Sequence, residues 1–168
     1  MVLETERLLL RPYKTKDLAG YHALMSSPEV WTYSTQEPHT SLSQSRRNMR
    51  KTKFHALFEQ ESGRYIGEAG ILSMKQSASR CEIGYNLLPE FWGHGYATEI
   101  AKALVGYAFD ELKVERVEAL AIKANVASCG VLEKAGLALE GTLRHFARIR
   151  GTYQDVCYYA IIASDTRG

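Results

Sequence analysis

Long apolar runs, clustered cysteines and a dominant charge of one sign are all missing from this 168-residue sequence. Its apolar runs are far shorter than the roughly 20 residues that a membrane-spanning helix needs, and acidic residues interrupt the N-terminal segment where a secretory signal is apolar. The formal net charge is only +2, so charge gives no indication of nucleic-acid or membrane binding. We therefore expect a cytoplasmic protein with no membrane segment.

Cysteine is equally scarce. Cys81, Cys129 and Cys157 are the three in the chain, well separated in sequence and odd in number. None belongs to a metal-ligand spacing, so we expect reduced thiols and no metal site.

The composition is that of an ordinary globular protein, with 45% hydrophobic and 24% charged residues. A chain of this length buries roughly two thirds of its unfolded surface when it folds, so it needs no disulfide or metal to hold a core. No repeat, linker or low-complexity tract divides it. We expect one domain that spans residues 1–168.

Periodicity predicts a mixed α/β fold. The strands expected from residue pattern and turn signals span 7–11, 54–59, 64–74, 80–88, 114–122, 137–149 and 153–163. Short loops make most of these neighbours antiparallel. A helix is expected to run from Thr15, which can cap it, to about Met25. Further helices are expected over 41–51, over 97–112 and over 126–135, where apolar residues recur at helical spacing or a cap is present. The predicted architecture is a mostly antiparallel sheet with a central strand-helix-strand unit and flanking helices.

A glycine loop stands between the strand at 80–88 and the clearest amphipathic helix. Gly93-His94-Gly95 directly precedes that helix, whose first amides have no partner within the helix and whose dipole favours an anion. This arrangement suits a diphosphate, although a tight turn alone explains most such motifs. It is not a Walker loop, because no Gly-Lys-Ser/Thr follows, and Thr98 stands where a dinucleotide fingerprint has its third glycine.

A second motif follows the buried strand at 114–122. Asn125 is a natural N-cap for the next helix, and Ser128 falls in the first turn. Taken alone, capping explains Asn125 fully.

Together the two motifs resemble those of the GNAT superfamily of acyl-CoA N-acyltransferases, in its RimJ/RimL-like branch. The resemblance runs over essentially the whole chain and is carried by these segments: Thr5 to Arg11 (TERLLLR), Glu82 to Tyr85 (EIGY), Phe91 to Glu99 (FWGHGYATE), Asn125 to Gly136, Glu140 to Arg144 (EGTLR), and Gly151 to Asp155 (GTYQD) with Tyr158-Tyr159. It implies a GNAT-like fold and an enzyme that uses acetyl-CoA without a metal.

The resemblance also assigns positions to the cofactor. The loop amides would hold the CoA diphosphate, here at Gly93, His94, Gly95, Tyr96, Ala97 and Thr98. The preceding strand would carry a bulge, splay from its neighbour and pair through Leu87 and Leu88 with the pantetheine arm. Asn125 would contact the same arm, and Ser128 would lie near the sulfur.

The chemistry requires a neutral amine, a donor to the oxyanion and a proton for the thiolate. The amide of Leu87 is the candidate oxyanion donor. Many relatives place a tyrosine four residues after the Ser128 position, but this chain has Leu132 there, so Ser128 is the expected substitute.

A base for the amine is less evident from the sequence. Glu82 is the first choice, because an acid at the edge of an apolar strand can have a raised pKa, but it could equally face solvent. Glu68 and Asp155 are the alternatives. Cys129 adjoins Ser128, yet direct transfer needs no acyl-enzyme and we expect no catalytic role for this thiol.

The acceptor amine is left open by the sequence. The leading hypothesis is the N-terminal α-amine of a protein, as ribosomal-protein acetylases of this branch modify; the alternatives are a small-molecule amine (a polyamine, amino acid or amino-sugar drug) or a non-catalytic acyl-CoA-binding sensor. Trp31 and Tyr33 are candidates for an acceptor site or for core packing, and the basic residues at 46–53 are expected to be a solvated helix face. We expect a monomer or homodimer and no nucleic-acid partner.

Overall fold

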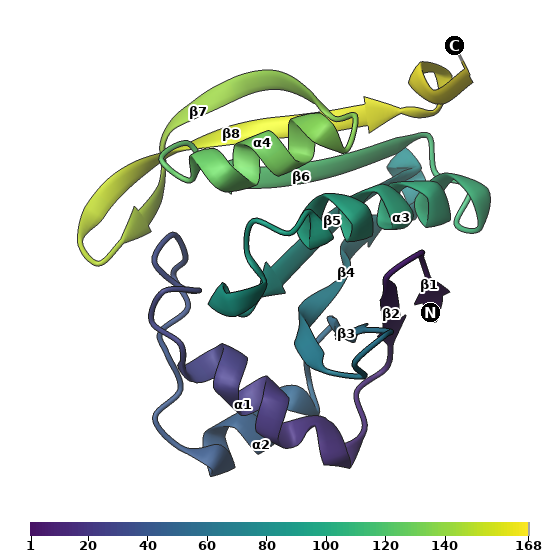
Figure 1. Ribbon diagram of the computed structural model, residues 1–168. Coiled ribbons are helices and arrows are strands. Elements are labelled where there is room, and N and C mark those ends of the chain that lie inside the picture. The colour runs from purple at the N-terminus through teal and green to yellow at the C-terminus, as the bar shows by residue number, and fades with distance from the viewer. Residues whose placement is uncertain (168) are drawn as a thin grey trace.

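The computed structural model describes residues 1–167, which are built around an eight-stranded sheet in the order β1-β2-β3-β4-β5-β6-β8-β7 (Figure 1). Neighbouring strands are antiparallel except β5 and β6, which are parallel. The strands are β1 Leu3–Glu4, β2 Leu8–Arg11, β3 His55–Glu59, β4 Tyr65–Lys75, β5 Arg80–Leu87, β6 Arg116–Ile122, β7 Ala138–Ile149 and β8 Thr152–Ile162. The expected mixed, mostly antiparallel sheet is confirmed.

The α-helices of the described chain form two pairs. They are α1 Leu18–Ser26, α2 Leu42–Met49, α3 Tyr96–Asp110 and α4 Val126–Lys134. Figure 1 shows α3 and α4 together against the middle of the sheet and α1 and α2 together below it. Because α3 joins the parallel strands β5 and β6, the expected strand-helix-strand unit is also confirmed. None of the helices in residues 1–167 has the length and apolarity to span a bilayer.

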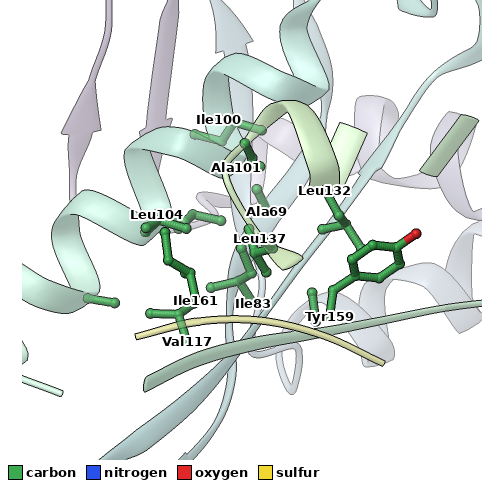
Figure 2. Packing of buried hydrophobic residues seen from close by; sticks show 14 of the residues in the cluster. Ala69, Ile83, Ile100, Ala101, Leu104, Val117, Leu132, Leu137, Tyr159 and Ile161 are labelled. Carbon is green, nitrogen blue, oxygen red and sulfur yellow. The ribbon is translucent and has the colours of Figure 1, made fainter. Parts of the chain in front are cut away.

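The main core lies between α3, α4 and the sheet (Figure 2). Alternation along β5 determines which side chains enter it, because successive residues of a strand point to opposite faces. Cys81, Ile83 and Leu87 of β5 belong to this core. Gly84 and Asn86 therefore face the other side, toward α1. The core also holds Ile100, Ala101 and Leu104 of α3, Val117 of β6, Leu132 of α4, and Tyr159 and Ile161 of β8.

The two parallel strands separate after a short paired segment. β5 and β6 are in register only from Arg80 to Glu82, opposite Arg116 to Glu118. Glu118 is buried at the closed end and bonds Arg80 and Arg116 at 2.6 and 2.7 Å. Beyond this point, within the part of the chain that the structure describes, β5 has no ladder partner on its β6 side. This is the splay that the resemblance implied.

Two sequence-based details were wrong. The bulge expected in β5 lies in β4, where Ile71 pairs with Ile83 and Ser73 with Glu82, which leaves Leu72 as the extra residue. Leu72 fills the space beside Gly84, where an added Cβ would come within 2.6 Å of its Cδ1 atom. Thr15 does not cap α1. It lies in the 3-10 turn Thr15–Asp17, and the carboxylate of Asp17 accepts the N–H of Lys14 at 2.7 Å.

Candidate active site

A cavity of about 810 Å³ opens where β5 and β6 separate. Glu68 and Glu82 line it on the α1 face of the sheet, and Ser128 and Leu132 line it on the α4 face. The cavity therefore connects the two faces through the gap between the strands. A substrate bound on one face can reach a group bound on the other through this gap.

The glycine loop has the backbone conformation that its sequence predicted. Gly93 and Gly95 have φ angles of +77° and +81°, in the left-handed region where side chains are disfavoured. The first helical bond of α3 joins the N–H of Glu99 to the carbonyl of Gly95 at 3.0 Å. The amides of Tyr96, Ala97 and Thr98 precede that bond, so they open onto the loop. These residues fit a diphosphate cradle.

The side chains around the loop have structural contacts. The His94 ring stacks on the Tyr96 ring with centroids 5.8 Å apart, and the Tyr96 hydroxyl donates to Glu59. The exposed carboxylate of Glu90 forms an ion pair with Arg64 at 2.5 Å. The Tyr96 hydroxyl is therefore occupied, and the backbone amides of His94 and Tyr96 remain for the cofactor role that the resemblance implied.

Sequence reasoning missed a role for Arg7. Its Nη1 atom donates to the carbonyl of His94 at 2.9 Å, and its Nε atom donates to Glu99 at 2.7 Å. The guanidinium also lies 4.5 Å from the centre of the Tyr96 ring. Arg7 thus ties the N-terminal segment to the glycine loop and adds a positive charge beside it. The signal was present in the TERLLLR segment, but nothing in the sequence says what this arginine contacts.

Leu87 and Leu88 differ in their free backbone groups. The N–H of Leu88 donates to the carbonyl of Ile66 at 2.9 Å, and the carbonyl of Leu88 accepts the N–H of Phe91 at 3.0 Å. Because N–H directions alternate along a strand, the N–H of Leu87 points away from β4 toward the splay. Its carbonyl accepts the indole N–H of Trp92 at 2.8 Å. The Leu88 amide is therefore occupied and cannot pair with the pantetheine arm, which corrects the expectation for this residue. The Leu87 amide stays available.

Asn125 caps α4 as expected. Its Oδ1 atom accepts the N–H of Ser128 at 3.2 Å, and both residues line the cavity. The hydroxyl of Ser128 lies 3.2 Å from the hydroxyl of Tyr85, which stands on β5 beyond the point where β6 departs. Burial raises the pKa of Tyr85 to about 12. Leu132 is buried in the core and contributes no polar group.

Glu68 is the unusual acid of the cavity. The residue is only 2% exposed, and it is buried like the acids Asp17 and Glu118, but those two are held by arginines. The partners of Glu68 are neutral: the Tyr13 hydroxyl at 3.1 Å and the Asn86 side-chain amide at 3.0 Å. Burial outweighs these hydrogen bonds and raises the pKa of Glu68 to about 7.

The other two candidate bases are placed differently. Glu82 lines the cavity but is partly exposed, and it accepts a hydrogen bond of 3.3 Å from Ser73. Asp155 accepts the N–H of His145 at 2.9 Å, where β7 bulges and His145 has a φ of +52°. Asp155 therefore stabilises the hairpin, and the cavity lining does not include it.

Loop 27–40 and the tip of the β7–β8 hairpin enclose the α1 side of the cavity. Trp31 is buried with its indole N–H on the carbonyl of Leu24 at 3.1 Å, while Tyr33 is 43% exposed, and both line the cavity. Arg150, at the hairpin turn, donates to the carbonyls of Trp31 and Thr32 at 3.3 Å each. Figure 1 shows the hairpin tip next to this loop.

The cysteines and the basic segment carry no chemistry of their own in this site. Burial raises the pKa of Cys129, which disfavours the reactive thiolate. Within the basic segment Arg46, Arg47, Arg50 and Lys53 are exposed, and Lys51 borders the cavity. The described residues contain no group of three or more His, Cys, Asp or Glu side chains placed to hold a metal ion.

Comparison with known proteins places this geometry in context. A sequence-family model described as an acetyltransferase (GNAT) domain matches residues 7–138. The chain is 34% identical over 172 residues to the uncharacterized N-acetyltransferase YoaA of Bacillus subtilis, covering 96% of each protein. It is 26% identical over 151 residues to the spermidine N(1)-acetyltransferase of Escherichia coli, covering 87% of this chain and 81% of that enzyme. The crystal structure of a GNAT-family acetyltransferase from Bacillus anthracis superposes with a TM-score of 0.90 at 27% identity, covering 96% of this chain and 98% of the other.

Proposed function

Because the chain belongs to the GNAT family of acetyltransferases, we propose that it transfers the acetyl group of acetyl-CoA directly to a primary amine, which Glu68 deprotonates. The observation that carries this proposal is a buried carboxylate with no cationic partner at the junction of two faces of the sheet. An amine reaches the enzyme mainly as its ammonium form, which cannot attack a thioester. A base whose pKa lies near neutrality takes that proton most effectively.

The cofactor half of the site is supported by the glycine loop and the splayed strand. The amides of residues 93–98 would hold the CoA diphosphate, and the Leu87 amide would lie along the pantetheine arm and serve the developing oxyanion. Asn125 would contact the same arm from α4. Ser128 would lie at the sulfur.

The acceptor half favours a small organic cation over a protein N-terminus. Two carboxylates, Glu68 and Glu82, and one ammonium, Lys51, are the charged groups that line the cavity in the described chain. The aromatic residues that line it, Tyr21, Trp31, Tyr33, Phe54, Tyr85 and Phe146, suit the apolar and cationic parts of an aliphatic amine. Arg150 closes the hairpin tip onto loop 27–40, which narrows the approach for a protein chain. The resemblance to a spermidine acetyltransferase agrees with this class.

An acceptor screen tests the reaction and the substrate class together. Acetyl-CoA is incubated with the protein and with polyamines, amino acids, an amino-sugar drug and peptides with free N-termini, and products are identified by mass spectrometry. We expect acetylated polyamine as the main product. If only peptides are acetylated, the acceptor is the N-terminal α-amine of a protein and the small-amine proposal is wrong. If acetyl-CoA binds but no acetylated product forms, the protein is a non-catalytic acyl-CoA-binding sensor.

The pH dependence of kcat/KM tests the base. We expect an acid limb near pH 7 in the wild type, because only ionised Glu68 accepts a proton. Glu68→Gln should lower kcat/KM by roughly 100- to 10,000-fold and remove this limb, as expected for loss of a general base. Glu82→Gln is the matched control and should keep the limb. If Glu82→Gln removes the limb and Glu68→Gln retains it, Glu82 is the base and this assignment is wrong.

A further inference from the structure

The departing thiolate needs a proton, and the α4 tyrosine that supplies it in many relatives is Leu132 here. Ser128 alone is a poor source, because an aliphatic hydroxyl is a weaker acid than a phenol and its proton must be replaced during each turnover. A second hydroxyl in contact with Ser128 would replace that proton directly. The structure provides one from a different strand.

We propose that Tyr85 is the proton source behind Ser128, so that the two hydroxyls form a relay to the CoA sulfur. This inference rests on the proposed acetyl transfer and adds a positioning residue to it. The Tyr85 hydroxyl lies 3.2 Å from the Ser128 hydroxyl and 3.4 Å from the Ser128 carbonyl, although 43 residues separate the two in sequence.

The position of Tyr85 in the sheet supports this role. The residue lies three positions beyond Glu82, the last β5 residue that pairs with β6, so its side chain stands in the gap that the thioester must cross. It faces α4 and the main core, whereas Asn86 faces Glu68 on the acceptor side. Because successive residues of β5 point to opposite faces, Tyr85 lies on the α4 face and Asn86, which contacts Glu68, lies on the acceptor face.

Neighbouring phenols are committed to other partners. The Tyr159 hydroxyl donates to Glu133 at 3.0 Å, and the Tyr96 hydroxyl donates to Glu59. Tyr85 is the phenol that contacts Ser128 in the described chain. A phenol is protonated at neutral pH, so Tyr85 has a proton to give.

The step balances in atoms and charge. The neutral amine forms a C–N bond to the thioester carbon, the C–S bond breaks, and its electron pair stays on sulfur. The sulfur takes the Ser128 proton while Ser128 takes the Tyr85 proton. The resulting tyrosinate regains a proton from solvent, and the acylated nitrogen releases one, so the products are the amide and free CoA thiol.

Tyr85→Phe tests the relay. We expect kcat to fall by roughly ten- to a thousandfold, the scale of one lost charge-stabilising donor, while KM for acetyl-CoA stays nearly constant. Tyr107→Phe on α3 is the matched control, since the structure assigns no hydrogen bond to the Tyr107 hydroxyl, and it should leave kcat unchanged. Because the wild type is assayed first, a failure of acetyl transfer itself is distinguished from a failure of the relay.

A double-mutant cycle distinguishes a relay from two separate effects. If Tyr85 acts through Ser128, Tyr85→Phe combined with Ser128→Ala should cost no more than the larger single loss, because either change breaks the same path. Multiplicative losses would overturn the relay. In the Tyr85→Phe background, Leu132→Tyr restores a phenol at the position used by relatives, and we expect it to recover part of kcat. A kcat of Tyr85→Phe within twofold of the parent, with chemistry rate-limiting, would also refute the proposal.

Discussion

Gly95 is a single residue on which the cofactor site depends. Its φ of +81° lies in the left-handed region, and its Cα faces the guanidinium of Arg7, where an added Cβ would lie 3.4 Å from Nη2. A phosphate that approaches the loop amides needs the same open backbone. The loop therefore has a conformational and a steric reason for glycine at this position.

We predict that Gly95→Val raises KM for acetyl-CoA at least tenfold while the protein stays folded, because a branched side chain disfavours this φ and blocks the phosphate approach. Steady-state kinetics with varied acetyl-CoA, together with circular dichroism, measures both effects. Gly106→Ala is the control: Gly106 lies in α3 with open space around it, so alanine should leave KM unchanged and stabilise the helix by up to about 1 kcal/mol. An unchanged KM in Gly95→Val would contradict the phosphate cradle.

At the scale of elements, a chain of polar groups joins α1, loop 27–40 and α2. Asn48 lies 2.8 Å from Nε2 of His39, and the buried hydroxyl of Ser45 lies 2.8 Å from Nδ1 of His39 and 2.7 Å from Nδ1 of His22. One serine hydroxyl donates one proton and accepts others, so Ser45 can bond both rings at once. This cluster positions the wall of the cavity that carries Trp31 and Tyr33.

We predict that Ser45→Ala lowers the free energy of unfolding by about 1–3 kcal/mol, because it leaves two ring nitrogens without their partner. It should also raise KM for the amine more than KM for acetyl-CoA, since α2 and loop 27–40 border the acceptor side. Ser43→Ala, at an exposed position on the same helix, is the control and should change neither quantity. Equal effects of the two substitutions would show that the cluster does not position the wall.

Acid should weaken the same cluster. Burial, and then the nearby His22, lower the pKa of His39 below its ordinary 6.5. The unfolded chain therefore binds more protons than the folded one just below pH 6.5, and the contribution of His39 to stability is lost as pH falls through this range. The difference in unfolding free energy between wild type and His39→Gln should be smaller at pH 5.5 than at pH 7.5. The pKa of Glu68 is raised, so its contribution to the unfolding free energy grows as pH falls. Glu68 is present in both proteins, so this contribution cancels in the difference.

At the scale of the whole molecule, acetyl-CoA should link parts of the chain that are distant in sequence. The glycine loop, the free edge of β5 and the start of α4 form one surface only in the folded state. We predict that acetyl-CoA at a hundredfold excess over Kd adds about 2.7 kcal/mol to the free energy of unfolding. Thermal or denaturant unfolding with NAD and ATP at the same concentration provides the comparison. Equal stabilisation by NAD would contradict the acetyl-CoA assignment.

The sequence by itself determined the order and type of most elements. The helix at 97–112 was expected and α3 spans Tyr96–Asp110, because a 3.6-residue period is a local property that packing against the sheet preserves. The terminal hairpin and the Asn125 cap were predicted correctly for the same reason: turn and cap chemistry acts over a few residues. The glycine loop was also identified, since positive φ angles at Gly93 and Gly95 follow from residue type.

Only the tertiary structure decided which side chains meet. The sequence placed Glu82 ahead of Glu68 as the candidate base, but burial depends on which segments cover a strand, and Tyr13 and Asn86 give the buried Glu68 neutral hydrogen-bond partners. The sequence assigned both Leu87 and Leu88 to the pantetheine arm, whereas in the structure the amide of Leu88 is bonded to the Ile66 carbonyl of β4. The contact between Tyr85 and Ser128 exists because β5 and β6 separate after Glu82 and α4 lies over the gap. Such contacts arise from the packing of distant segments, which no local pattern encodes.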